Sequence, residues 1–237
     1  MKLLLVAVYY QLLIFLRIKQ AVFFSLAFPI FLFVIFGSIW GGTNPDYIPF
    51  LLSGVLGMTI ASEGLFVVGP VIKEYYANGL IKYFKKLPFN VLWHFIALIT
   101  SRVIVFFVTL LLLVVVAKIV FACSVGVYQI LHFALGALIG LFVFSFIGLC
   151  LAFFGIKYES TKGMTNFIYF ILLFTSTAFY SIGSFNTLIN TIGNILPLNP
   201  VLAILRNENP NVWIILLWTV LPISIFYYLF TKTEFKR

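Results

Sequence analysis

Charged residues are scarce in this chain of 237 residues, since Asp, Glu, Lys and Arg together make up only 9%. Soluble proteins carry about 25%, because a folded surface in water needs charge. Two stretches have no charge at all, 38 residues between Lys118 and Lys157 and 43 between Lys162 and Arg206. A bilayer core about 30 Å thick takes roughly 20 apolar residues to cross as a helix. The scarcity of charge excludes a soluble protein and predicts an all-α integral membrane protein.

Residue types that carry much of enzyme chemistry are also few. Gly is never followed by Lys, which excludes a P-loop for ATP. The two histidines, His94 and His132, lie on different apolar segments and form no His-Glu-x-x-His pair, so no metal site is expected. Asp46 is the only aspartate, which excludes an intramembrane aspartyl pair. We therefore expect no catalytic residue, metal or cofactor in this chain itself.

Cysteine is rare too, and Cys123 and Cys150 lie on segments that should end at opposite sides of a membrane. A disulfide between them is not expected. The formal net charge is +9, but the cations stand in short clusters between apolar runs. That distribution is typical of cytoplasmic membrane loops and argues against nucleic acid as a partner.

Six apolar segments are long enough to cross a bilayer, and no polar block could fold alone, so residues 1–237 should form a single transmembrane domain. The predicted spans are 21–40, 48–71, one within 91–117, 129–153, 164–182 and 212–230. The apolar run of residues 3–16 is short for a span, and basic residues follow it instead of a cleavage site. We interpret residues 1–20 as a helix at the inner interface, with a buried segment as the alternative.

The distribution of Lys and Arg predicts the topology. With the N-terminus in the cytoplasm, twelve of these residues lie in inner segments and only Lys118 and Arg206 lie in outer ones. Cytoplasmic loops carry such an excess of positive charge. Six spans with both termini inside, in a plasma (inner) membrane, is the self-consistent arrangement.

The segment of residues 183–211 does not fit a simple outer loop. It has no charge before Arg206, is partly apolar, and is too short for two further crossings. Non-helical or broken backbone at membrane depth is tolerated where protein covers it. We expect a re-entrant helical hairpin at the outer side.

Two charges fall inside predicted spans, Glu63 in the second and Arg102 in the third. An ionisable group in a bilayer is expensive and usually faces a partner, a cavity or the bundle interior. One interpretation is a salt bridge between Glu63 and Arg102 that holds two helices together. The other places Glu63 on a substrate path.

Hydroxyl side chains in two spans also allow two interpretations, a structural role or a place on a substrate path. Thr59 and Ser62 share a helix face with Glu63 in the second span. Thr175 and Ser176 belong to a polar run in the fifth span. These residues could line a path, or their hydroxyls could bond to carbonyls of their own helix.

The inner segment of residues 73–88 carries the most informative local motif. Gly79 stands nine residues before Pro88, and apolar residues recur between them at helical spacing, with lysines on the other side. This pattern predicts a short amphipathic helix with a defined end. By itself it could be a basic helix that rests on anionic lipid.

At this segment the chain resembles the type-2 ATP-binding-cassette exporter permeases. In that family the same loop forms a coupling helix that docks onto a separate ATPase subunit. The family spacing is matched by Gly79, Lys82, Phe84 and Pro88. The resemblance implies that the ATPase is contacted by Glu74, Gly79, Lys82, Phe84, Lys85 and Pro88. Glu74 is shifted by one residue from the usual acidic position, and tyrosines replace the usual charges.

A second match is the segment from Leu196 to Arg206, since the family has a Pro-rich turn and an Arg after its fifth span. The corresponding residues here are Pro197, Pro200 and Arg206. The resemblance covers the whole chain. It implies a second permease subunit, identical or similar, and ATP-binding subunits that hold ATP and magnesium.

The resemblance therefore implies the membrane subunit of an ABC exporter that is not itself an enzyme. Aromatic residues and few charges favour an amphipathic or lipid-like substrate, such as a drug, a lipid-linked molecule or a hydrophobic peptide. Two alternatives stay open. One is an ATP-independent secondary transporter or channel, and the other is a membrane assembly or anchoring protein.

Overall fold

The structure is a computed structural model that describes residues 2–42, 44, 46–80, 91–153, 158–180 and 187–234. In this part of the chain every regular element is a helix, so the all-α fold class is confirmed. The first five elements follow one another along the chain, with breaks at Ile18 and between Trp40 and Tyr47. They are α1 (Lys2–Arg17), α2 (Lys19–Val22), η1 (Phe23–Ala27), α3 (Phe28–Trp40) and α4 (Tyr47–Glu63).

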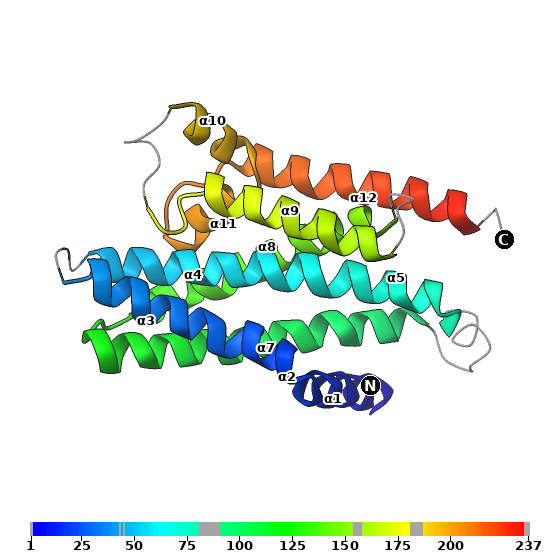
Figure 1. Cartoon of the computed structure of the whole chain (residues 1–237), viewed down its shortest axis with the longest axis horizontal. Coiled ribbons are helices and arrows are strands. Elements are labelled where there is room, and N and C mark those ends of the chain that lie inside the picture. The colour runs from blue at the N-terminus through cyan, green and yellow to red at the C-terminus, as the bar shows by residue number, and fades with distance from the viewer. Residues whose placement is uncertain are drawn as a thin grey trace.

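The remaining helices complete a bundle of long, roughly aligned elements (Figure 1). They are η2 (Gly64–Val68), α5 (Gly69–Ala77), α7 (Val91–Phe121), α8 (Val127–Phe153), α9 (Tyr158–Thr175), α10 (Thr187–Ile195), α11 (Leu198–Leu205) and α12 (Val212–Glu234). The elements η1 and η2 are single π-helical turns set into longer helices. The long helices are rich in apolar residues. Such segments fold as helices in a membrane, because a helix satisfies its backbone hydrogen bonds within one segment.

Five helices are long and apolar enough to cross a membrane, namely Lys19–Trp40, Tyr47–Tyr75, Ile96–Phe121, Val127–Phe153 and Val212–Leu229. They match five of the six predicted spans. The bent pair α10 and α11, which turns by 83°, raises the number to six if it counts as one span. This broken pair lies where the sequence predicts a re-entrant hairpin.

The predicted fifth span, 164–182, differs from what the structure contains. The helix α9 begins earlier, at Tyr158, and ends at Thr175, after which residues 176–180 are bent and not helical. Glu159, Lys162 and other polar residues in its first turns lower its hydropathy, so α9 is not among the five candidate spans. One face of α9 packs against η2, α5 and α8, and its other face is exposed.

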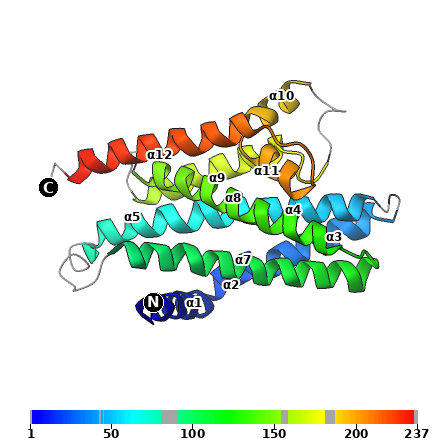
Figure 2. The same cartoon turned by 180° about the vertical axis from the view of Figure 1, so that it is seen from behind.

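The ends of the helices divide between two sides of the molecule. The N-terminal helix, the end of α5, the start of α7 and the end of α12 lie together at one end (Figure 1). We call this the terminal end. The start of α4, the start of α8 and the bent pair lie at the other, which we call the opposite end, and Figure 2 shows the same division from behind. This is the arrangement expected from an even number of crossings.

The helix α1 packs against α7 at the terminal end. Val8, Gln11 and Phe15 are buried, whereas Leu5 and Leu16 are exposed. Ile18, with φ −89° and ψ 89°, separates α1 from α2. The N-terminal helix therefore ends at Arg17, not at residue 20, and one face of it is anchored on the protein.

The centre of the bundle is the helix made of α4, η2 and α5. Within α4, every residue from Leu51 to Ala61 is buried. Its neighbours include α3, α7, α8, α9 and α11. Glycines bring it close to α8, since a Cβ on Gly64 would lie 2.5 Å from the Cβ of Phe144. Small residues permit such close helix contacts in membranes.

Large apolar side chains cover the outside of the bundle. Leu111 on α7 is 61% exposed and Phe167 on α9 is 67% exposed, and similar residues occur on the other long helices. In water a surface of this kind would aggregate. In a bilayer the same side chains contact lipid chains that are as apolar as they are.

Candidate functional site

A buried charge cluster lies where the central helix changes from α4 to η2. The Glu63 carboxylate is 2% exposed and its Oε2 lies 3.8 Å from Nη1 of Arg102 on α7. Its other oxygen, Oε1, accepts a hydrogen bond from the Ser25 hydroxyl on η1. The two charges that the sequence places within spans are thus brought together, and Ser25 joins them from a third element.

Further contacts extend this cluster toward the N-terminal helix. The guanidinium of Arg102 lies 5.1 Å from the ring centroid of Phe15 on α1, a cation–π arrangement. Thr109 on α7 donates to the carbonyl of Ser25 at 3.0 Å. Within the described residues, Glu63 Oε2 and Arg102 Nε are buried without a hydrogen-bond partner. The pair therefore ties η1, α4 and α7 together while two of its polar atoms stay unsatisfied.

Two π-helical turns flank the cluster. Ser25 lies within η1, and η2 begins at Gly64, directly after Glu63. Such turns insert an extra residue into a helix and are frequent at functional sites. Sequence reasoning missed both turns and missed Ser25. No local pattern marks these positions, because Ser25 is separated from Glu63 by 38 residues.

The hydroxyls proposed for a substrate path bond to carbonyls of the preceding helical turn. Thr59 donates to Val55 O at 2.8 Å and Ser62 donates to Thr59 O at 2.9 Å.

The hydroxyls at the end of α9 also bond to carbonyls of the preceding turn. Thr175 donates to Ile171 O at 2.7 Å and Ser176 donates to Leu173 O at 2.9 Å. These bonds satisfy the hydroxyl donors locally. A role of Thr59, Ser62, Thr175 and Ser176 along a path stays a prediction.

The segment predicted to couple to an ATPase begins differently from the expectation. Lys73 and Glu74 lie on the last turns of α5, which ends at Ala77 and so continues the central helix. Gly79 then adopts φ 70°, a left-handed conformation that glycine tolerates and that commonly ends a helix. The predicted helix of residues 73–88 therefore does not start at residue 73. Lys82, Phe84, Lys85 and Pro88 lie outside the described residues.

A polar contact joins the central helix to α9 at the same end. Lys73 Nζ donates to the Thr161 hydroxyl at 2.7 Å. Thr161 is buried, and Thr165 in the next turn is buried as well. Sequence reasoning missed this link, since a lysine near a membrane surface usually points to water.

At the opposite end, Arg206 is the centre of a second polar cluster. Its Nε donates to the Ser53 hydroxyl at 2.9 Å, and its two terminal nitrogens donate to Thr177 Oγ1 at 2.9 Å and to Thr177 O at 2.7 Å. The guanidinium carbon lies 3.8 Å from the ring centroid of Phe50. One arginine therefore holds α4, the segment after α9 and the end of α11 together.

The two prolines of the outer motif shape the bent pair. Pro197 directly precedes α11, and Pro200 lies in its first turn, where a missing N–H costs little. Asn199 between them accepts a hydrogen bond from the Thr177 backbone N–H at 2.9 Å. The motif therefore builds the start of α11 and joins it to the network of Arg206.

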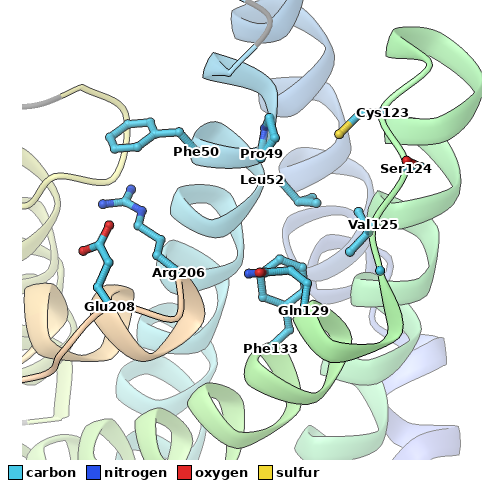
Figure 3. A pocket seen from close by; sticks show the side chains of 11 residues that line it. Pro49, Phe50, Leu52, Cys123, Ser124, Val125, Gln129, Phe133, Arg206 and Glu208 are labelled. Atoms are coloured by element: carbon cyan, nitrogen blue, oxygen red, sulfur yellow. The ribbon is translucent and has the colours of Figure 1, made fainter.

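A cavity of about 390 Å³ opens beside Arg206 (Figure 3). Its floor comes from the start of α4 and its walls come from the α7–α8 connection, the first turns of α8 and the segment after α11. The lining residues are Pro49, Phe50, Leu52, Cys123, Ser124, Val125, Gly126, Gln129, Phe133, Arg206 and Glu208. Sequence reasoning did not predict this cavity, because its residues come from four separate segments.

No group of three or more His, Cys, Asp or Glu residues that could hold a metal ion occurs among the described residues. The polar chemistry described for this part of the chain consists of the buried ion pair of Glu63 and Arg102, the hydroxyls and the cavity beside Arg206.

A bundle of apolar helices with a broken outer pair and a few buried polar clusters is the architecture of a multi-pass membrane domain. The family model of the ABC-2 type transporters matches residues 2–208. The chain therefore belongs to the ABC-2 type transporter family, and it is a permease subunit of an ABC transporter. A search of the curated proteins found no match. The final helix, α12, lies beyond the matched residues and packs against α8 and α11.

Proposed function

We propose that this permease moves an amphipathic or lipid-like substrate outward and is driven by ATP hydrolysis on a separate subunit. The observation that carries the proposal is the central helix. It runs from Tyr47 at the opposite end to Ala77 at the terminal end, and most of its residues from Leu51 to Pro70 are buried. It ends at Ala77, within the predicted coupling segment of residues 73–88, and Gly79 follows in a left-handed conformation. A force applied there acts directly on the best packed element of the subunit.

The contacts of the central helix suggest how movement is passed on. Lys73 is bonded to Thr161, so a displacement of α5 also displaces α9. The π-helical turn from Gly64 to Val68 is a point at which the helix can change its hydrogen bonding. Glu63 lies directly before it and is held by Ser25 and Arg102. We propose that ATP-driven movement at Gly79 alters the hydrogen bonding of the central helix as far as this π-helical turn.

The partners follow from the same proposal. The ATPase subunit carries ATP and magnesium and docks at the terminal end, which faces the cytoplasm of a plasma (inner) membrane. A second permease subunit, identical or similar, completes the path. The substrate is amphipathic, such as a drug, a lipid-linked molecule or a hydrophobic peptide, because the chain has few charged residues (9%) and many aromatic ones (19%).

The first test is co-purification. The solubilised protein should bring an ATPase with it, and the complex in sealed vesicles should move an amphipathic fluorescent probe only when ATP is supplied on the terminal side. Full transport by the permease alone, in vesicles without nucleotide, would overturn the proposal.

A variant at Gly79 tests the coupling. Gly79→Leu places a side chain on a residue with φ 70°, which L residues rarely adopt. We expect ATP hydrolysis to continue while transport per ATP falls by roughly tenfold or more, the effect of losing about 1.4 kcal/mol of coupling. Gly163→Leu is the matched control, since Gly163 also has open space around it but lies within α9. Equal coupling in both variants would remove the role assigned to Gly79.

A further inference from the structure

The cavity beside Arg206 has features of a binding site that the transport function does not require. It lies at the opposite end of the bundle, where α3 ends at Trp40 and α4 begins at Tyr47, with the two ring centroids 6.0 Å apart. Aromatic residues of this kind collect at the level of the lipid headgroups. Its volume of about 390 Å³ falls within the roughly 300–1,000 Å³ of small-molecule sites. The cavity is therefore placed and sized for a small polar group at the membrane surface.

Two opposite charges lie on one wall of this cavity. Figure 3 shows the Glu208 carboxylate beside the Arg206 guanidinium, with Cys123, Ser124 and Val125 on the facing wall. Glu208 is exposed, so its carboxylate is open to a ligand. The cavity thus presents an anionic and a cationic side chain next to each other. A zwitterion could place its cationic group against Glu208 and its anionic group against Arg206.

Arg206, which lines the cavity, retains hydrogen-bonding capacity beyond its bonds to Ser53 and Thr177. A guanidinium has five N–H groups, and its partners Ser53 and Thr177 use three of them. These three bonds and the ring of Phe50 hold the guanidinium in one position. A fixed guanidinium recognises a phosphate well, because little side-chain freedom is lost on binding.

The remaining lining adds polar and apolar contacts. Gln129 donates one amide N–H to Leu205 O at 2.6 Å, which orients its side chain, and Ser124 is exposed nearby. Leu52 and Phe133 are buried and form an apolar base. A headgroup with a short apolar stem matches this lining, whereas the cavity is too small for whole acyl chains.

We propose that this cavity binds the headgroup of a zwitterionic phospholipid of the phosphoethanolamine type from the outer leaflet. The phosphate lies against Arg206 and the ammonium lies against Glu208. Such binding stabilises the contacts of α4, the α7–α8 connection and α11 from the outside. The site does not depend on ATP or on a partner subunit, so it can be tested separately from transport.

The experiment uses the full chain in detergent with short-chain phosphatidylethanolamine, and with phosphatidylglycerol of the same chain length as the anionic comparison. Native mass spectrometry or a thermal shift measures binding. We expect the zwitterionic lipid to bind more tightly to the wild type. Glu208→Gln should weaken its binding by roughly fivefold, the effect of one exposed charge pair, and should not weaken phosphatidylglycerol binding.

Asp46→Asn is the matched control, because Asp46 is also an exposed acid at this end but does not line the cavity. It should leave the preference unchanged. Equal binding of the two lipids to the wild type, or equal effects of Glu208→Gln and Asp46→Asn, would overturn the proposal.

A second measurement locates the ligand. In a Cys150→Ser background, Cys123 on the cavity wall is the single thiol. Phosphatidylethanolamine should slow its reaction with a maleimide severalfold in the otherwise unaltered protein and much less in Glu208→Gln. No protection of Cys123 at saturating lipid would exclude this cavity as the site.

Discussion

The two polar clusters of this permease satisfy their charges in different ways. At the opposite end, Arg206 donates to neutral acceptors on Ser53 and Thr177 and lies against the ring of Phe50, and the exposed Glu208 carboxylate lies beside it. In the bundle interior, Arg102 meets Glu63 at 3.8 Å, and each of these two residues keeps a buried polar atom without a partner among the described residues. The first cluster is a well-bonded clamp, and the second is an under-satisfied ion pair.

This difference suggests different roles. A clamp in which three N–H groups of one guanidinium bond to fixed acceptors keeps the broken outer helices in place during movement. An ion pair with unsatisfied atoms loses less when it is rearranged, because fewer hydrogen bonds hold it. Glu63 and Ser25 also lie at the two π-helical turns, where the backbone itself is irregular. We therefore expect movement of the bundle near Glu63 and rigidity near Arg206.

The largest effect should come from breaking the inner pair. Arg102→Met leaves Glu63 buried without its counter-charge and should lower the free energy of unfolding by about 3–5 kcal/mol. The double variant Glu63→Gln with Arg102→Met should recover most of that loss, because neither charge is then buried. Unfolding in detergent, followed by circular dichroism, measures both.

Lys118→Met is the control for the inner pair, since it removes a charge from an exposed position on the same helix α7. It should change stability little. A double variant no more stable than Arg102→Met would show that the ion pair is not what the single variant disrupts.

A smaller effect is expected at the outer clamp. Arg206→Lys keeps the charge but loses the planar fork that reaches Ser53 and Thr177 together. We expect a loss of about 1–3 kcal/mol, less than at Arg102, because water can reach this end. Arg17→Lys, at an exposed position, is the matched control for the same unfolding measurement. If Arg206→Lys matched the wild type, the comparison between the two clusters would fail.

The smallest effect concerns pH at the outer cavity. Burial raises the pKa of the Cys123 thiol, and only the thiolate reacts with a maleimide. In a Cys150→Ser background, Cys123 should therefore react more slowly near pH 8 than an exposed thiol, and the difference should shrink as the pH rises above the ordinary thiol pKa of about 8.5.

The comparison thiol for this experiment is Ser124→Cys in a chain with both native cysteines replaced by serine, since Ser124 is exposed. An impermeant maleimide added from outside also tests the topology. Identical rates for the two thiols at every pH would contradict the partly buried position of Cys123. Labelling only from the terminal side would contradict the proposed orientation.

Much of the fold could be predicted from the sequence. The spans from Tyr47 to Tyr75 and from Val127 to Phe153 follow the hydropathy of local runs, and the broken pair follows from an uncharged segment rich in turn residues. The end of α9 at Thr175 could not be predicted, because the apolar pattern continues past it. There the chain bends to meet α4, where Gly54 allows the Ala178 carbonyl to approach.

The polar sites divide in the same way. Glu63, Arg102 and Arg206 attract notice in the sequence because a charge within an apolar run is expensive. Their partners Ser25, Ser53 and Thr177 carry no such signal. The bond of Lys73 to Thr161 could not be predicted from the sequence either, because it depends on where α9 begins.

The sequence by itself determined that this chain resides in a membrane and crosses it as helices, because bilayer insertion depends on the apolar character of local segments and a helix satisfies its own backbone. Only the tertiary structure decided which polar groups meet. Those meetings depend on how closely the helices approach, and small residues such as Gly64 and Gly148 set that distance where the central helix crosses α8. The physical reason is that hydropathy is a local property, whereas the pairing of buried charges is a property of the packed bundle.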